Sequence, residues 1–234
     1  MKALIFAAGL GERMRPLTEH TPKPLLAVAG KPLIVWHLER LAALGVRDVV
    51  VNTSWLAEQF PATLGDGSRW GLRLQFMHEG DMPLETGGGM LNALPLLGDA
   101  PFLAINGDIW CDFDFARLPT EPEGEAHLLL VNNPEHHPEG DFILDANGHV
   151  HDTGAGPRLT FAGLGVYRPS LLAGWRQAVG DTEGADAAPP RFKLAPLLRA
   201  AMARSAMHGQ HHRGRWTDVG TPQRLQALDA ALSG

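Results

Sequence analysis

The sequence predicts an α/β fold in which helices flank a mostly parallel sheet. The chain opens on a short apolar run, residues 2–6, that ends in the turn Ala-Ala-Gly. Apolar runs of strand length then alternate with segments of helical periodicity as far as residue 131. Strands and helices that alternate at this spacing form right-handed βαβ units, whose strands lie parallel in one sheet.

Each expected strand is a short run rich in Val, Ile, Leu or Phe, bounded by glycine or polar residues. These runs are residues 2–6, 47–51, 72–77, 101–105, 126–131 and 159–167. A hairpin is expected over residues 142–150, because Asn147-Gly148 is a favoured two-residue turn. The second half of the chain is thus expected to contain a hairpin, in contrast to the alternating strands and helices of the first half.

Each expected helix combines apolar residues at helical spacing with a start or stop signal. The expected helices are residues 31–44, 54–64, 86–97, 192–202 and a last one beginning at Pro222. In the first of them Leu38 and Leu41 share a face, and Gly45 provides the stop. Ser54 and Thr221 are expected to be N-caps. The polar, Gly- and Pro-rich segment 180–190 is expected to be a loop.

Composition narrows the class of protein. The 234 residues include 20 Lys and Arg against 26 Asp and Glu, a net charge of −6, with no basic tract to suit duplex nucleic acid. The single cysteine, Cys111, excludes an internal disulfide and a multi-cysteine metal site. The sequence contains no run of about 18 apolar residues, the length needed for a helix to span a membrane. The first residues turn to glycine and charge too early for a signal peptide. We expect one cytoplasmic domain with no nucleic-acid or membrane partner.

The turn after the first strand has the character of a phosphate-binding loop. Gly9 and Gly11 let backbone N–H groups approach an anion closely. Arg13, Arg15 and Lys23 follow close behind, and a proline on each side of Lys23 stiffens the backbone that aims it. A rigid cation beside a glycine loop suits a triphosphate, whereas a solvated basic loop would not need that stiffening.

Two other nucleotide-binding motifs are disfavoured. Met14 stands where the dinucleotide fingerprint has its third glycine, which argues against a dinucleotide-dependent oxidoreductase. The Walker A pattern Gly-x4-Gly-Lys-Ser/Thr does not occur in the sequence.

Two carboxylates from distant segments are candidates for a metal site. Asp108 follows the expected strand 101–105, and ligands of open α/β sheets bind at that edge. Asp218 lies 110 residues later, before the last expected helix. Two carboxylates together with phosphate oxygens are a usual way to hold Mg²⁺. Each also has a local interpretation, Asp108 as a turn residue and Asp218 as a residue that approaches a helix.

Residues 7–34, AAGLGERMRPLTEHTPKPLLAVAGKPLI, resemble the signature of the sugar-1-phosphate nucleotidyltransferases. The pattern joins Gly-x-Gly-x-Arg, Pro-Leu-Thr, Pro-Lys-Pro and Val-x-Gly-Lys-Pro. The resemblance implies a Rossmann-like α/β domain with a mixed sheet, here without a C-terminal β-helix because no hexapeptide repeat occurs. It also implies a single domain, residues 1–234, with a nucleotide-binding half (1–110) and a sugar-binding half (111–234).

The resemblance implies roles for individual residues, matched position by position. Catalytic roles fall on Arg15, Lys23 and Asp108, and the carboxylates that would hold Mg²⁺ are Asp108 and Asp218. The residues expected to contact the nucleotide are Ala8, Gly9, Gly11, Glu12, Arg13, Lys23, Gly80, Glu85, Thr86 and Gly87. Those expected to contact the sugar phosphate are Asn106, Asp141, Gly163 and Lys193.

Three further segments, residues 132–142, 161–163 and 192–198, are similar to the N-acetylmuramate-1-phosphate uridylyltransferases of bacterial cell-wall recycling. This similarity implies that UTP and N-acetylmuramate 1-phosphate are the substrates. Lys193 would then meet the sugar phosphate or the lactyl carboxylate of muramate. The base-reading loop, 79–89, reads Leu-Glu-Thr-Gly-Gly where related enzymes have a Leu-Gly-Thr-Ala-type stretch, so the identity of the base is left open.

Two alternatives remain at this point. Within the family, the enzyme would transfer a nucleotide from GTP or dTTP to mannose, heptose or glucose 1-phosphate. In another class, the chain would be a non-catalytic regulator that binds a nucleotide sugar. The presence of Lys23, Asp108 and Asp218 argues against the regulator.

Overall fold

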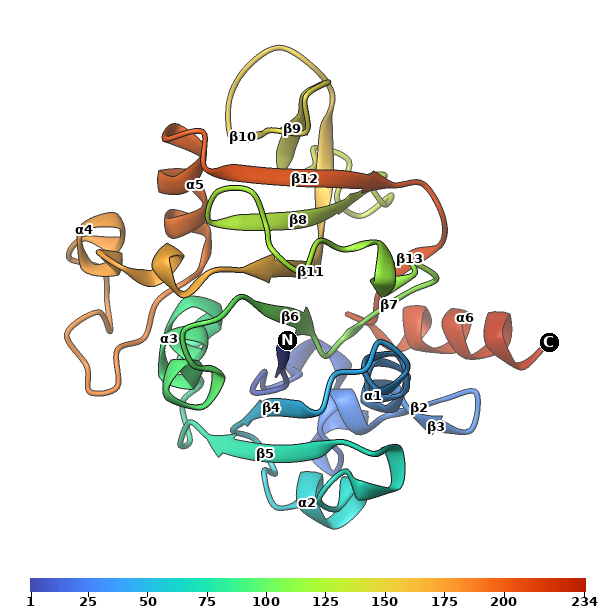
Figure 1. Cartoon of the computed structure of the whole chain (residues 1–234). Helices are drawn as coiled ribbons and strands as arrows, with labels where there is room; N and C mark the ends of the chain where they lie inside the picture. The colour runs from blue at the N-terminus through green and yellow to red at the C-terminus, as the bar shows by residue number, and fades with distance from the viewer.

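The computed structural model describes residues 1–234 and is built around one nine-stranded sheet with helices on both faces (Figure 1). Its main path runs β10-β9-β11-β6-β1-β4-β5, and β8 pairs with both β11 and β12. The strands of this sheet are β1 (Lys2–Phe6), β4 (Asp48–Thr53), β5 (Arg73–His78), β6 (Phe102–Asn106), β8 (Ala126–Val131), β9 (Phe142–Leu144), β10 (Val150–His151), β11 (Arg158–Tyr167) and β12 (Met207–His212).

Two small two-stranded sheets and six α-helices complete the chain. The small sheets are β2 (Ala27–Val28) with β3 (Lys31–Pro32), and β7 (Ile109–Cys111) with β13 (Trp216–Asp218). The helices are α1 (Leu33–Ala43), α2 (Gln59–Leu64), α3 (Glu85–Leu97), α4 (Trp175–Val179), α5 (Ala195–Ala203) and α6 (Pro222–Ser233).

The sheet is mixed: the first-half strands pair in parallel, and the second-half strands pair antiparallel except that β12 is parallel to β8. The strands of the first half, β6, β1, β4 and β5, are all parallel to their neighbours. β11 joins them antiparallel to β6, and it also pairs antiparallel with β8 and β9. The predicted fold class is confirmed, and the predicted hairpin is present as the antiparallel pair β9 and β10.

Alternation along the strands gives the sheet two apolar faces. In β1, Ala3 and Ile5 belong to one core and Leu4 to the other. The first core packs against α1 and α2, and the second against α3 and α5. Because both faces are covered, the central strands are apolar throughout, as expected for strands of a buried parallel sheet.

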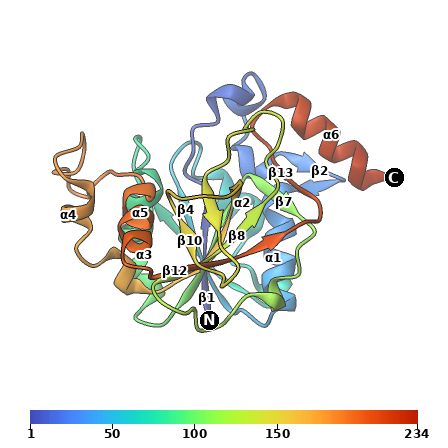
Figure 2. The same cartoon turned by 90° about the horizontal axis from the view of Figure 1, so that it is seen from above.

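The C-terminal helix extends the molecule beside the β2–β3 hairpin. Figure 2 shows α6 and this hairpin on one side and α4 and α5 on the other. Leu228 is buried in a third apolar cluster with Met14, Val28 and Trp110. The Thr221 hydroxyl accepts from the N–H of Arg224, so the predicted N-cap is confirmed. None of the helices is long and apolar enough to cross a membrane.

The six expected strands are all present, with ends shifted by at most two residues. Three expected helices are shorter than predicted: α1 begins at Leu33, α5 at Ala195 and, with the largest difference, α2 at Gln59. The prediction that Ser54 caps a helix was wrong: its hydroxyl donates to the Gly80 carbonyl at 2.6 Å. Leu56 has a left-handed φ of 50°, which interrupts helical backbone, so α2 begins only at Gln59. Strands β2, β3, β7 and β12 and helix α4 were not predicted.

Candidate active site

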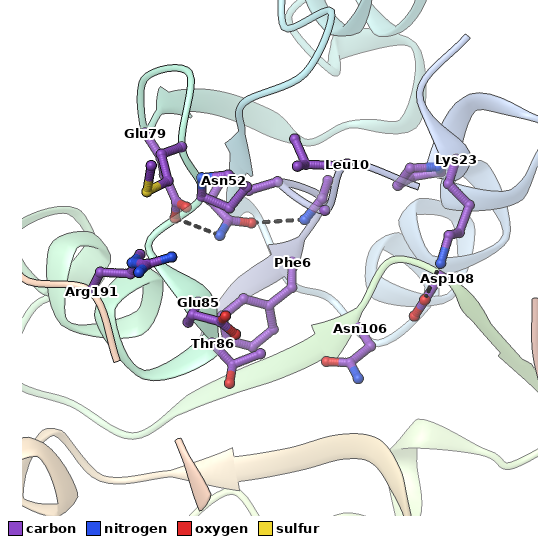
Figure 3. Close-up of a pocket in the computed structure, with 16 residues that line it drawn as sticks. Phe6, Leu10, Lys23, Asn52, Glu79, Glu85, Thr86, Asn106, Asp108 and Arg191 are labelled. Carbon is purple, nitrogen blue, oxygen red and sulfur yellow. Dashed lines mark hydrogen bonds and ion pairs between the residues drawn. The ribbon is translucent and has the colours of Figure 1, made fainter. Parts of the chain in front are cut away.

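A cavity of about 430 Å³ opens where β1, β4 and β6 end (Figure 3). These three strands are parallel, so their carboxyl ends meet at one edge of the sheet. Residues 6–10 line the cavity from the first strand end, Asn52 from the second, and Asn106 with Asp108 from the third. The cavity therefore lies where open α/β sheets bind their ligands.

The glycine turn that follows β1 has the conformation its sequence predicts. Gly11 has a φ of 67°, and a Cβ there would lie 2.8 Å from the side chain of Thr18. The Thr18 hydroxyl donates to the Gly11 carbonyl at 2.7 Å, and Met14 is fully buried beneath the turn. Arg13 and Arg15 are exposed, so their guanidinium groups project from a firmly anchored turn.

Lys23 and Asp108 meet at one end of the cavity. Lys23 Nζ lies 2.8 Å from Asp108 Oδ2, and the lysine side chain is only 13% exposed. Figure 3 shows this ion pair across the cavity from Glu79 and Arg191. The N–H of Gly107 donates to the Phe6 carbonyl at 2.8 Å, so the loop that carries Asp108 is fixed to the end of β1.

The strand that carries Asp218 is bonded directly to the Asp108 loop. Asp218 is in register with Ile109, and the N–H of Val219 donates to the Asp108 carbonyl at 2.7 Å. The structure has no cluster of three or more acidic, His or Cys side chains fit for a metal ion. Asp218 itself does not line the cavity. One carboxylate on each of two hydrogen-bonded segments nevertheless suits Mg²⁺, which keeps several water and phosphate ligands. The residues present fit such a metal.

The opposite end of the cavity is built by a buried hydrogen-bond chain. The Asn52 side chain accepts from the Ala7 N–H at 2.8 Å and donates to Glu79 at 2.7 Å. Glu79 also accepts from the Leu84 N–H at 2.8 Å. Burial raises the pKa of the Glu79 carboxyl above its usual range, and these two donors counteract that rise.

The start of α3 is covered by the segment that precedes α5. The N–H groups of Gly87 and Gly88 both donate to the Phe192 carbonyl at 3.0 Å, and the Thr86 hydroxyl accepts from the Leu194 N–H. Thr86 and Glu85 line the cavity, but Gly80 and Gly87 do not. The structure thus gives the Gly87 N–H a partner within the protein, where the sequence predicted a nucleotide contact.

The residues predicted for the sugar are less closely grouped. Gly163 lies against Asn106, because a Cβ at Gly163 would be 2.6 Å from the Asn106 amide nitrogen, and its φ is 74°. Asp141 does not line the cavity. Its carboxylate accepts from the Phe161 N–H at 2.8 Å and pairs with His137 at 3.1 Å.

Lys193 lies at a second cavity of about 300 Å³ that adjoins the first. Glu85 and Arg191 line both cavities. Arg191 pairs with Glu183 at 3.0 Å, whereas Lys193 forms no ion pair in the structure. The second cavity therefore presents a free cation next to the principal site.

Comparison with known proteins agrees with this geometry. The family model described as "Nucleotidyl transferase" matches residues 2–142. The chain belongs to the nucleotidyl transferase family. This enzyme is 49% identical over 98% of its length to the N-acetylmuramate alpha-1-phosphate uridylyltransferase of Neisseria meningitidis, of which it covers 97%. It is 36% identical over 99% of its length to the protein of that name from Caulobacter vibrioides, of which it covers 96%.

A solved structure supports the fold. The crystal structure of a Bacillus anthracis protein assigned as a glucose-1-phosphate thymidylyltransferase, in complex with a sucrose, superposes with a TM-score of 0.83 at 20% identity. The match covers 100% of the enzyme and 95% of that chain. The predicted family and enzyme class are confirmed. Members of this family take a nucleoside triphosphate and a sugar 1-phosphate and generally use a divalent metal.

Some residues that line the principal cavity of the enzyme were not singled out from the sequence. Glu79, Met82 and Pro83 lie within the segment 79–89 that was expected to read the base, but no role was assigned to them individually. Asn52 was missed; it is a polar residue at the end of β4, and that position was the signal available to find it. Arg191 follows the Gly- and Pro-rich loop, and no sequence pattern pointed to it. Met82 and Pro83 line the cavity from the loop before α3.

Proposed function

We propose that the enzyme transfers UMP from UTP to N-acetylmuramate 1-phosphate with the help of Mg²⁺, giving UDP-N-acetylmuramate and pyrophosphate. The observation that carries this proposal is the meeting of Lys23 and Asp108 at one end of the cavity, with the Asp218 strand bonded beside them. The names of the two curated relatives favour this nucleotide and this sugar over the alternatives. Since UTP is a cytoplasmic metabolite, we also propose a cytoplasmic location.

The chemistry needs no general base in the protein. A sugar 1-phosphate has a second pKa of about 6 and is mostly a dianion at neutral pH. One of its oxygens attacks the α-phosphorus in line, the new O–P bond forms, and the bond to the β-phosphate oxygen breaks to release pyrophosphate. The protein has to bring two polyanions together and stabilise charge on the leaving group.

The charged end of the cavity suits that task. In the proposed complex Lys23 exchanges its contact with Asp108 for triphosphate oxygens, and the Gly9–Gly11 backbone receives others. Arg13 and Arg15 neutralise the remaining phosphate charge from the rim, where they are exposed. Asp108 and Asp218 would hold Mg²⁺. When bound, this ion neutralises phosphate charge and polarises the reacting phosphoryl group.

The opposite end of the cavity suits the nucleoside. Thr86 and Glu85 offer polar atoms at the start of α3, and Ala8 and Gly9 offer backbone at the end of β1. The chain from Ala7 through Asn52 to Glu79 holds these two segments in a fixed relation. We propose that a base stacks into this space and is read by the segment 80–87 through groups other than the occupied Gly87 N–H.

The second cavity supports muramate as the sugar. Muramate differs from glucosamine by a lactyl ether that carries a carboxylate. A cavity that adjoins the reaction site and presents a free lysine suits such an anion. We therefore propose that Lys193 meets the lactyl carboxylate, while Asn106, Asp141 and Gly163 belong to the sugar side.

A matrix of nucleotides against sugar phosphates tests the proposal. Purified enzyme with Mg²⁺ is incubated with UTP, GTP or dTTP and with the 1-phosphates of N-acetylmuramate, N-acetylglucosamine, mannose, heptose and glucose, and pyrophosphate release is measured. We expect the highest kcat/KM for UTP with N-acetylmuramate 1-phosphate. A higher value for GTP with mannose 1-phosphate would reject the proposed substrates but keep the reaction class, and no release from any pair would favour the non-catalytic regulator.

A further inference from the structure

The Asp218 carboxylate is held from two directions through a single oxygen. Arg224 Nη1 donates to Oδ1 at 3.1 Å, and His136 Nε2 lies 2.9 Å from the same oxygen. The Asp218 side chain is 23% exposed, and the Arg224 side chain 19%. One oxygen of a partly buried carboxylate thus contacts both side chains, and Oδ2 contacts neither of them.

The turn after Asp218 is shaped to allow this arrangement. A Cβ on Gly220 would lie 2.9 Å from Asp218 Oδ2 and would collide with the Arg224 guanidinium. A side chain at 220 would therefore displace the guanidinium from Asp218 and crowd Oδ2. A carboxylate with one oxygen anchored by the protein and the other without a hydrogen bond to the protein is oriented as a one-oxygen ligand.

The Arg224 side chain bonds to Asp218 but leaves one of its own donors, Nε, without a partner. Its backbone N–H bonds to Thr221 at the start of α6, which fixes the residue at the first turn of the helix. Its Nε is buried and finds no partner among the polar atoms of the protein. A buried donor without a partner costs about 1–3 kcal/mol, and the Nη1 contact with the Asp218 carboxylate is the polar contact that offsets this cost.

His136 reaches Asp218 from the loop between β8 and β9. Asn133 fixes this loop by donating to the carbonyls of Pro138 and Arg158. Asp141 fixes its far end by accepting from the Phe161 N–H. His136 therefore comes from a held segment, on the side of the site that is proposed to face the sugar.

We propose that Arg224 and His136 are positioning residues that anchor Oδ1 of Asp218 and so present Oδ2 to the divalent metal. The inference rests on the proposed metal-dependent transfer. It assigns a task to two residues that the reaction itself does not need. Groups that orient a metal ligand typically change metal affinity by about 10- to 100-fold when they are removed.

Metal binding without turnover tests this inference. Free Mn²⁺ is counted by electron paramagnetic resonance while it is titrated into enzyme that is saturated with α,β-methylene-UTP, which cannot be cleaved at the α-phosphate. We expect His136→Ala and Arg224→Ala each to raise the Kd for Mn²⁺ about tenfold or more. His136→Gln keeps a side-chain N–H and is expected to stay within about threefold of wild type.

Matched controls separate positioning from general damage. His151 pairs with Asp145 at 3.0 Å and Arg204 with Glu125 at 2.6 Å, both away from the cavities, so His151→Ala and Arg204→Ala should leave the Kd for Mn²⁺ unchanged. Asp218→Asn should abolish the site. If Arg224→Ala does not fold, His136→Ala still decides, because that side chain is 44% exposed and lies in a loop.

Three outcomes would overturn the inference. The first is a Kd for Mn²⁺ within twofold of wild type in the His136 and Arg224 variants. The second is a lower melting temperature in these variants with unchanged Mn²⁺ affinity, which would mean a purely structural role. The third is unchanged binding in Asp218→Asn. No sugar phosphate is present in this titration. A failure of N-acetylmuramate 1-phosphate as a substrate would therefore not be mistaken for a failure of Arg224 and His136 to position Asp218.

Discussion

The two ends of the principal cavity are held together by different forces. The end that holds Lys23 and Asp108 is called here the metal end, after the metal proposed to bind there. Side chains from distant segments meet at it: Lys23 pairs with Asp108, and beside the cavity Arg224 and His136 contact Asp218, which is not part of the cavity lining. At the base end, backbone groups and two buried polar side chains make a fixed network among β1, β4 and the start of α3. At the metal end, a bound ligand can replace the partners of the charged side chains. At the base end, the hydrogen bonds are already formed within the protein before a ligand binds.

This difference implies that substitutions at the two ends should have different consequences. Ion pairs in a partly open site contribute little to stability because water screens them. Changes at the metal end should therefore lower kcat and leave folding intact. Buried hydrogen bonds and close packing contribute directly to stability, so changes at the base end should lower stability and nucleotide affinity together.

The largest effect is expected for Asp108→Asn. This change removes a charge that the proposed metal needs and also the partner of Lys23. We expect kcat to fall at least about a hundredfold, with a melting temperature close to wild type. Asp114→Asn is the matched control, since Asp114 only caps a short 3₁₀ helix, and asparagine also caps well. Undiminished turnover in Asp108→Asn would contradict the proposed mechanism.

The stability of the protein should fall in acid because of a histidine on α1, the helix that packs near the Asp108 loop. His37 on α1 is fully buried, and burial, helped by the nearby Arg40, lowers its pKa from 6.5 to about 4. Between these two pH values the unfolded chain binds a proton that the folded chain does not, so stability present above pH 6.5 is lost as pH falls toward 4. The loss attributable to His37 amounts to about 3 kcal/mol.

Urea unfolding at several pH values measures this loss. His37→Leu should show a shallower fall in the free energy of unfolding between pH 6.5 and 4 than wild type. His20→Gln, which changes an exposed histidine, should keep the wild-type slope. An equal slope in His37→Leu and wild type would mean that other groups cause the acid sensitivity.

The base end can be broken by adding one methyl group. A Cβ on Gly88 would collide with the Pro190 carbonyl and lie 3.1 Å from the Leu84 side chain, because the segment before α5 is bonded to the start of α3. Overpacking of this kind costs about 1–3 kcal/mol. We expect Gly88→Ala to lower the melting temperature and raise the KM for UTP, with a smaller change in kcat.

Gly234→Ala is the control for the added methyl, since nothing lies closer than 3.9 Å to a Cβ there. A Gly88→Ala enzyme with normal stability and UTP affinity would show that the segment before α5 can shift without consequence. Changes at the base end would then no longer differ from Asp108→Asn by lowering stability.

The comparison also explains how far sequence reasoning could reach. Lys23 and Asp108 were found because local patterns mark them: a proline-flanked cation after a glycine turn, and an acid at a strand end. The family signature implied them as well. Contacts between segments far apart in the chain leave no such pattern. The sequence showed neither that Phe192 would cover the Gly87 and Gly88 N–H groups nor that His136 would reach Asp218.

The same limit applies to the fold. The expected apolar strands were found, but β12 was missed because its sequence, MHGQHH, is polar and lacks alternation. Its position comes from parallel pairing with β8 over six residues, a long-range contact that outweighs low strand propensity. Helix α2 was overestimated because Ser54 bonds to Gly80 across the structure instead of capping locally.

The smallest effect is expected at the second cavity, which belongs to neither end. Lys193→Met keeps most of the side-chain length but removes the free charge. If this lysine meets the lactyl carboxylate, KM should rise on the order of tenfold for N-acetylmuramate 1-phosphate and stay unchanged for N-acetylglucosamine 1-phosphate, which has no such carboxylate. Lys31→Met, in which a lysine paired with Glu39 is lost, should change neither value. An equal rise for both sugars would assign Lys193 to the shared phosphate instead, and the preference for muramate would then have to come from the loop that carries His136 and Asp141.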